Sequence, residues 1–93
     1  MVYLVTYVLT DDTADKHVAV ETALRKIPSW AKLRLGVWLV SDSTMTAAQI
    51  RDAIWRDGLS EGDRIFVARL VSEWGSYNFP QTILDWLEKV ATF

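Results

Sequence analysis

Two hydrophobic patterns divide the first third of the chain into a strand and a helix. Residues 2–9 are nearly apolar on both faces and rich in β-branched and aromatic side chains, which is typical of a central strand in a sheet. Residues 10–13 supply polar turn and cap side chains, and the next apolar residues repeat at the i, i+3, i+4, i+7 spacing of a helix. That spacing predicts an amphipathic helix that ends before Pro28 and buries Val20, Ala23, Leu24 and Ile27.

The next segment predicts a hairpin. Residues 31–35 and 37–40 are two short extended runs on either side of Gly36, and a glycine between two such runs favours a turn. The first run is the weaker of the two, because charged and apolar side chains are mixed in it.

A second helix is expected to begin at Thr46. Thr46 and Gln49 have the spacing of a capping box, in which the Thr hydroxyl accepts from the Gln amide and the Gln side chain reaches back. Gly58 stands where a glycine in the left-handed region would end this helix. Residues 59–63 then predict a turn, and residues 64–71 a largely buried strand.

This order of elements predicts an α+β fold. Strand, helix, strand, strand, helix and strand form the split βαβ, ferredoxin-like arrangement (βαββαβ), in which right-handed crossovers place both helices on one face of an antiparallel sheet. Residues 1–71 make up this core. Residues 72–93 form a C-terminal extension in which Pro80 opens an added helix, expected to pack on the other sheet face or on a second copy of the protein.

Length and composition limit the classes of protein. Ninety-three residues with 51% hydrophobic and 24% charged side chains are expected to form a single domain, residues 1–93, and not a disordered chain. The chain has no Cys, which excludes disulfides, thiolate zinc sites and cysteine nucleophiles. No apolar run is long enough to span a membrane and no signal segment is evident, so we expect a cytoplasmic protein without membrane association.

Two short motifs suggest chemistry but have ordinary structural explanations. Gly58, Ser60 and Gly62 match the G-x-S-x-G pattern of hydrolases, yet here the pattern follows a helix and precedes a strand, so we interpret it as a turn. His17 is the one histidine, and it has no Ser or Cys at a spacing that indicates nucleophilic catalysis. We therefore expect His17 to be a half-buried structural residue.

Asp11 and Asp12 are weak catalytic candidates. They directly follow the first predicted strand, where carboxylates could hold magnesium through oxygen ligands. Aspartates before a helix are also favoured as caps and by the positive end of the helix dipole. We favour the capping interpretation, with no cofactor unless the magnesium alternative holds.

Charge is unevenly distributed although the net charge is only −2. Residues 22–41 contain four basic side chains and no acidic one, together with Trp30 and Trp38. Such a segment could contact phosphates through its cations and stack bases on its rings. The alternative, which we favour because the chain as a whole is acidic, is a solvated helix end and sheet edge. The candidate nucleic-acid contacts are Arg25, Lys26, Trp30, Lys32 and Arg34.

Five tryptophans present more aromatic surface than the core of a 93-residue chain can easily bury. Trp55 lies off the inner stripe of the second helix and Trp74 lies beyond the last core strand. Because Trp is enriched at subunit interfaces, these positions favour an interface, although partial burial under the C-terminal helix is equally plausible. The interface candidates are Trp55, Trp74, Phe79 and Trp86.

Several segments together resemble a known group. They are Tyr3-Leu-Val-Thr-Tyr7, Trp30-Ala-Lys32, Val37-Trp-Leu-Val40, Ala48-Gln-Ile-Arg-Asp-Ala53, Gly62-Asp-Arg-Ile-Phe-Val-Ala-Arg-Leu70, Gly75-Ser-Tyr-Asn-Phe-Pro80 and Asp85-Trp-Leu87. In order and spacing they resemble the SinR-like proteins, which are related to the small CRISPR-associated endoribonucleases (Cas-two) and to virulence-associated protein D.

The resemblance implies a ferredoxin-like homodimer. In the nuclease members a Tyr-Asp pair ends the first strand, and the two Asp side chains hold a metal across the dimer. This chain has Tyr7-Val8 instead, and Val has no oxygen for magnesium. Asp11 is about 10 Å further along an extended chain.

Three functions therefore stay open. The leading hypothesis is a homodimeric binding scaffold without nuclease activity, with a protein partner or with RNA or DNA. The alternatives are a magnesium-dependent endoribonuclease using Asp11 or Asp12, and a small structural subunit of a larger assembly.

Overall fold

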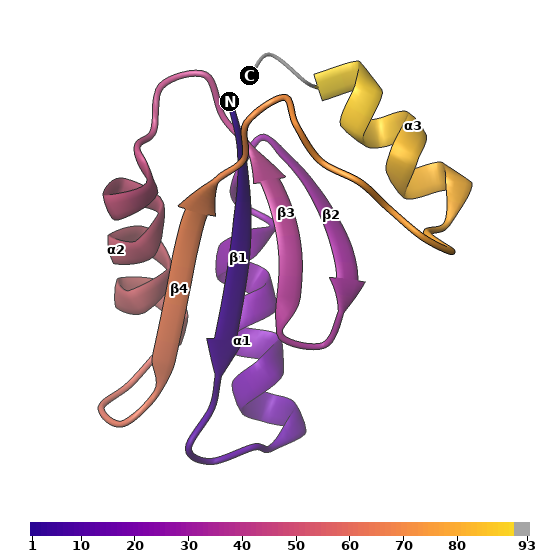
Figure 1. The fold of residues 1–93 in the computed structure, drawn as a ribbon. Helices are drawn as coiled ribbons and strands as arrows, with labels where there is room; N and C mark the ends of the chain where they lie inside the picture. The colour runs from indigo at the N-terminus through magenta and orange to yellow at the C-terminus, as the bar shows by residue number, and fades with distance from the viewer. Residues whose placement is uncertain (91–93) are drawn as a thin grey trace.

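A computed structural model describes residues 1–90 of the chain. These residues form four strands and three helices. Their bounds are, in chain order, β1 Val2–Val8, α1 Ala14–Leu24, β2 Ser29–Arg34, β3 Val37–Ser41, α2 Ala47–Gly58, β4 Arg64–Arg69 and α3 Gln81–Val90, and Figure 1 shows their arrangement. The predicted α+β, ferredoxin-like order with an added C-terminal helix is confirmed. The last three residues of the predicted extension lie outside the described residues.

The four strands form one antiparallel sheet in the order β2-β3-β1-β4. β1 is central, as its two apolar faces predicted, and Val5 lies opposite Trp38 on one side and Val67 on the other. The hairpin of β2 and β3 turns at Gly36, whose φ of 82° is costly for any side chain with a Cβ. β2 and β4 are the two edge strands.

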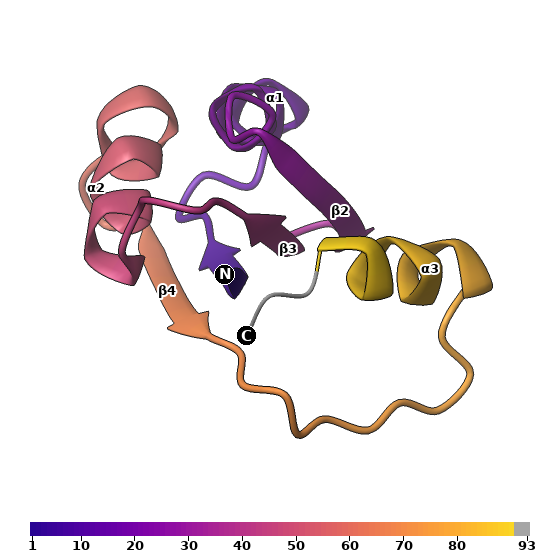
Figure 2. The ribbon, with the colours of Figure 1, turned by 90° about the horizontal axis from the view of Figure 1, so that it is seen from above.

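Both α1 and α2 cover one face of the sheet, while α3 lies on the opposite side next to β2 (Figure 2). Side chains alternate between the faces of a strand, so every second residue of β1 points into the core beneath α1 and α2. The predicted α1 stripe is buried, although α1 ends at Leu24 and Ile27 follows in a turn. The core cluster contains Tyr3, Val5, Tyr7, Leu9, Val20, Leu24, Ile27, Trp38, Val40, Ile50 and Ile54.

The helix ends follow local hydrogen-bonding rules with one exception. Thr46 and Gln49 form the predicted capping box, with N–H···O distances of 2.9 and 3.1 Å. The prediction of a left-handed Gly58 is wrong, because Gly36 and Gly62 are the described glycines with positive φ. Gly58 is instead the last residue of α2, at a close contact between α2 and α1.

The added helix packs on the chain itself, which is the first of the two predicted possibilities. Leu87 is buried, and the indole N–H of Trp86 donates to the Ser29 hydroxyl of β2 at 2.9 Å. α3 therefore covers the β2 side of this face and leaves the β1 and β4 side open (Figures 1 and 2). None of the described helices is long and apolar enough to cross a membrane.

Candidate functional site

The loop after β1 places the two candidate aspartates in different settings. Thr13 is the N-cap of α1 and accepts from the Lys16 amide at 3.3 Å, so the prediction that an aspartate caps this helix is wrong. Asp12 instead contacts the His17 ring through Oδ1 and Nε2, while Asp11 is exposed.

His17 is a half-buried link between this loop and the sheet. Its side chain is 14% exposed, and Nδ1 lies 3.5 Å from the Tyr7 hydroxyl. Burial, helped by the negative charge of Glu21, raises the pKa of Tyr7. The cluster lines a hollow of about 230 Å³ together with Arg34. The expectation that His17 is half-buried is confirmed, and Asp12 is the partner that the sequence did not indicate.

Within residues 1–90 of one chain, no three His, Asp or Glu side chains converge in a way that could hold a metal ion. Val8 is the last residue of β1 and presents a hydrocarbon side chain that is 65% exposed. A magnesium site would need several oxygen ligands at this position. One chain of this protein does not supply them from the residues that the structure describes.

The basic segment is gathered by the fold and largely neutralised by it. Glu21 is buried and pairs with Lys32 at 2.6 Å and with Arg25 at 3.4 Å. Lys26 pairs with Asp57 at 3.6 Å. Arg34 makes no ion pair within residues 1–90. These pairs weaken the positive field that phosphate contacts would require.

The two tryptophans of the basic segment differ in access. Trp38 is fully buried, so the expectation that it could stack on a base is wrong. Trp30 is 38% exposed, and the Arg25 guanidinium lies 5.4 Å from its ring centroid. A base would have to displace this arginine to stack on that side of the ring.

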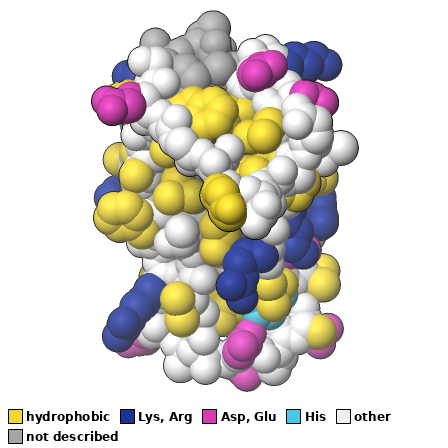
Figure 3. All heavy atoms as spheres, turned by 45° about the vertical axis from the view of Figure 1, so that its right-hand side comes forward, with side chains coloured by type: hydrophobic (Ala, Val, Ile, Leu, Met, Phe, Trp, Pro, Cys, Tyr) yellow, Lys and Arg dark blue, Asp and Glu magenta, His cyan; other side chains and the backbone are white. Residues whose placement is uncertain are grey.

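An exposed apolar surface lies on the open part of the sheet. Val8 and Phe66 are 65% and 64% exposed, and both belong to the set of alternate residues on β1 and β4 that points away from α1 and α2. Figure 3 shows hydrophobic side chains gathered on a side of the molecule that includes α3, with basic side chains beneath them. We name Thr6, Val8 and Phe66 the open face. Sequence reasoning missed Phe66, because strand alternation was not applied to residues 64–71.

Two interface candidates lie in the segment that leads to α3. Trp74 and Phe79 are both 41% exposed, and Tyr77 between them is 89% exposed. Trp74 and Phe79 line an apolar hollow of about 290 Å³, together with Leu4, Leu33, Leu39, Leu70, Gly75, Ser76, Leu84 and Leu87. Trp86 is half-buried by its contact with β2 and is therefore part of the fold of one chain.

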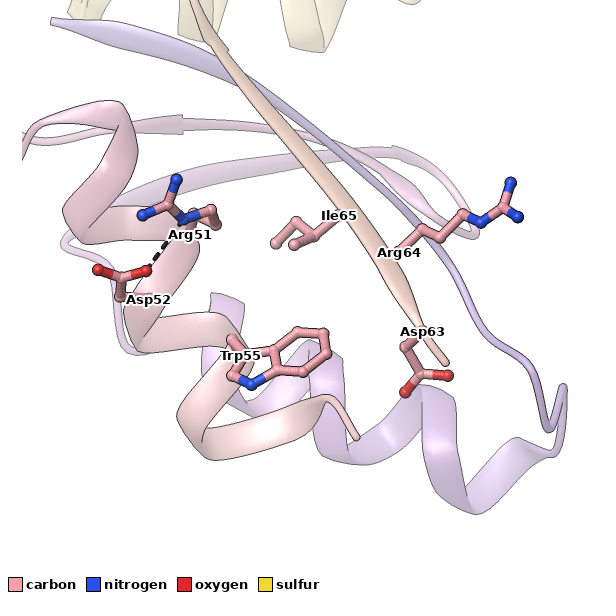
Figure 4. A pocket seen from close by; sticks show the side chains of 6 residues that line it. All are labelled: Arg51, Asp52, Trp55, Asp63, Arg64 and Ile65. Carbon is pink, nitrogen blue, oxygen red and sulfur yellow. Dashed lines mark hydrogen bonds and ion pairs between the residues drawn. The ribbon is translucent and has the colours of Figure 1, made fainter. Parts of the chain in front are cut away.

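The fourth interface candidate lies at the outer edge of β4. Trp55 is 43% exposed and points into a hollow of about 510 Å³ between α2 and β4 (Figure 4). Arg51 pairs with Asp52 at 2.9 Å at one end of this hollow, and Asp63 lies at the other.

The serine of the G-x-S-x-G pattern belongs to a turn, as expected. The Asp63 carboxylate accepts from the amides of Thr10 and Ser60, both at 2.9 Å, and from the Ser60 hydroxyl at 3.2 Å. Those bonds, the one from Thr10 first, hold the pKa of Asp63 below its usual value. Gly62 has a φ of 91°, as the turn requires.

Comparison of the chain with protein-family models, with curated proteins and with solved structures gave no match. The identification that stands is therefore structural: a small α+β protein with the ferredoxin-like βαββαβ topology and a C-terminal helix.

Proposed function

We propose that this protein is a homodimeric binding scaffold without nuclease activity, similar to the small CRISPR-associated and SinR-like proteins that its sequence resembles. The observation that carries the proposal is the open face. Its exposed large side chains, Val8 and Phe66, are hydrocarbon, on adjacent strands next to the uncovered edge of the sheet.

A second copy of the chain is the occupant that this surface favours. Exposed apolar patches on a small protein mark interaction sites, and a two-fold dimer uses the same patch twice. Val8 and Phe66 lie on adjacent strands and on the same side of the sheet, so the two-fold axis of such a dimer would bring the apolar side chains of both copies together.

The side chains at the open face support the proposed absence of nuclease activity. A metal-dependent nuclease needs carboxylates that meet at one point, and Val8 offers none. Asp12 is held by His17, and Asp11 lies on the exposed loop. No contact of the described residues favours the magnesium alternative, and none favours the structural-subunit alternative.

The dimer is tested by sedimentation equilibrium at tens of micromolar. We expect the unmodified protein to be dimeric and Phe66→Glu to be monomeric, because a buried unpaired carboxylate opposes association. Val18→Glu is the matched control, since Val18 is 60% exposed on α1, on the other side of the sheet, and it should stay dimeric. A monomeric unmodified protein overturns the proposed dimer.

The absence of nuclease activity is tested separately. RNA incubated with the protein and magnesium should remain intact, as it does with EDTA. Cleavage that needs magnesium and is lost in both Asp11→Asn and Asp12→Asn would contradict this part of the proposal and favour the endoribonuclease.

A further inference from the structure

The outer edge of β4 is an unpaired strand with a predictable set of free backbone groups. The Leu70 amide donates to the Val2 carbonyl at 2.9 Å, so Val2 and Leu70 are a hydrogen-bonded pair of the ladder with β1. Such pairs alternate along an antiparallel ladder, so Phe66 and Ala68 also bond to β1. The N–H and C=O groups of Ile65, Val67 and Arg69 therefore point away from the sheet and pair with no other strand within residues 1–90.

The two edges of the sheet differ in how they are protected. At β2, α3 packs against the strand and Trp86 bonds to Ser29. At β4, α2 packs against the strand but leaves the hollow of about 510 Å³ open beside its outer edge (Figure 4). A strand that is added at β4 would place alternate side chains into this hollow.

The walls of the hollow indicate what such side chains would be. Trp55 offers an exposed aromatic surface, and Ile65 adds an apolar floor (Figure 4). Arg69 lies on the same side of β4 as Ile65, four residues further along, and is exposed without an ion pair within residues 1–90. An apolar side chain against Trp55 and an acidic one near Arg69 fit this surface.

The charges at the ends of β4 also distinguish two possible occupants of its outer edge, a second copy of β4 and an acidic segment of another protein. If the β4 edges of two copies paired antiparallel, Arg64 of one would lie at the same end as Arg69 of the other, on opposite faces of the joined sheet, and the like charges gathered at each end would disfavour the pair. Arginines at both ends thus oppose self-pairing at this edge and attract an acidic segment. The open face, with its hydrocarbon side chains, is the separate surface of the proposed dimer.

We propose that the β4 edge binds an extended acidic peptide segment of a partner protein by strand addition, with an apolar side chain of that segment against Trp55. This proposal names the class of partner for the scaffold and so rests on the proposed function. It uses a different surface from the dimer.

The test measures binding of a fluorescein-labelled extended peptide in which a valine and a glutamate stand four positions apart, so that both side chains lie on the side of β4 that carries Ile65 and Arg69. Fluorescence anisotropy should show binding that weakens about tenfold or more in Trp55→Ala and in Arg69→Glu, as removal of a central aromatic or charged contact does. Arg56→Glu is the matched control, because Arg56 is the exposed neighbour of Trp55 on α2 and does not line the hollow. The same peptide with lysine in place of the glutamate, and the peptide interrupted by proline, should bind poorly.

Amide hydrogen exchange provides a readout of strand addition. The acidic peptide should slow exchange at the amides of Ile65, Val67 and Arg69 and leave those of Phe66 and Ala68 unchanged, since the latter already bond to β1. Absence of binding, equal binding to Trp55→Ala and Arg69→Glu, or protection elsewhere would overturn the proposal. Binding of labelled oligothymidine but not of the peptide, lost in Arg69→Glu, would reassign the edge to single-stranded nucleic acid and also overturn it.

The monomeric variant separates this proposal from the dimer. Phe66→Glu should still bind the peptide, because the added strand bonds to Ile65 and Val67. If the unmodified protein is monomeric and the peptide binds, the proposed dimer is contradicted and the proposed peptide binding at the β4 edge is supported. If the protein is dimeric and the peptide does not bind, the proposed dimer is supported and the proposed peptide binding at the β4 edge is contradicted.

Discussion

A Cβ atom on Gly58 would lie 2.8 Å from the Cα of Val20 and 3.1 Å from the Ala19 carbonyl oxygen. This distance is shorter than van der Waals contact, and the atoms that it meets belong to the backbone of α1. Glycine at this position is therefore what allows the end of α2 to approach α1 so closely. The close approach helps to seal the core between the two helices and the sheet.

Gly58→Ala should lower the free energy of unfolding. Alanine favours a helix over glycine by up to about 1 kcal/mol, while overpacking costs about 1–3 kcal/mol, so we expect a net loss of about 1–2 kcal/mol. Thermal unfolding followed by circular dichroism measures it as a lower midpoint. Gly75→Ala is the control, because no atom lies within 4 Å of a Cβ at that position, and its midpoint should stay near the original. An unchanged midpoint in Gly58→Ala would show that α1 and α2 can shift apart to admit the added Cβ atom without a loss of stability.

Asp63 should make stability depend on pH on the acid side. Amide hydrogen bonds from Thr10 and Ser60 hold its folded-state pKa below the unfolded value. A carboxyl with a depressed pKa stabilises the fold fully above its unfolded pKa, near 3.9, and that contribution is lost as pH falls through the folded pKa. Urea unfolding from neutral to acid pH should therefore show a steeper loss in the unmodified protein than in Asp63→Asn. High salt should leave the difference in place, because hydrogen bonds are screened less than distant charges. Equal slopes for the two proteins would contradict the assignment.

Glu21→Gln should strengthen binding to polyanions. The substitution keeps the side-chain shape and removes the negative charge that pairs with Arg25 and Lys32. Filter binding of an RNA duplex between about 50 and about 200 mM salt should show severalfold tighter binding than the original protein, with about 0.9 log units of salt dependence per phosphate contacted. The double variant Glu21→Gln with Lys32→Gln should lose most of the gain. If the single variant binds no better, the basic segment is not a nucleic-acid surface even when it is unpaired.

Trp86→Phe should loosen α3 from the sheet. The variant keeps an aromatic ring but loses the hydrogen bond to Ser29, which contributes about 0.5–1.5 kcal/mol. Limited proteolysis should then cut faster at residues 70–80, which connect β4 to α3. Trp55→Phe is the control, since Trp55 is 43% exposed on α2 and lies outside residues 70–80 and outside the hollow beneath α3. Equal cleavage rates would show that α3 is held by its apolar contacts alone.

Local patterns in the chain determined the elements and their order. The apolar run of residues 2–9, the helical stripe that begins at Val20, the capping box at Thr46 and the start of a helix at Pro80 each depend on neighbours in sequence. Backbone sterics and periodic burial act over these short distances, so the ferredoxin-like topology could be predicted from them. The conformation of Gly58 was predicted wrongly, because its constraint comes from α1 and not from its own helix.

Only the tertiary structure decided which side chains stand together. Asp12 contacts His17, Glu21 pairs with Lys32, and the Asp63 carboxylate accepts from the amide of Thr10, 53 positions away in the sequence. It also decided which apolar residues remain uncovered. Phe66 and Trp38 are both aromatic strand residues, but Trp38 lies on an inner strand and on the face that α1 and α2 cover, while Phe66 lies on an edge strand and on the opposite face. Pairing between distant residues and the coverage of a face depend on how elements pack in three dimensions. The spacing of residues along the chain carries no direct record of either.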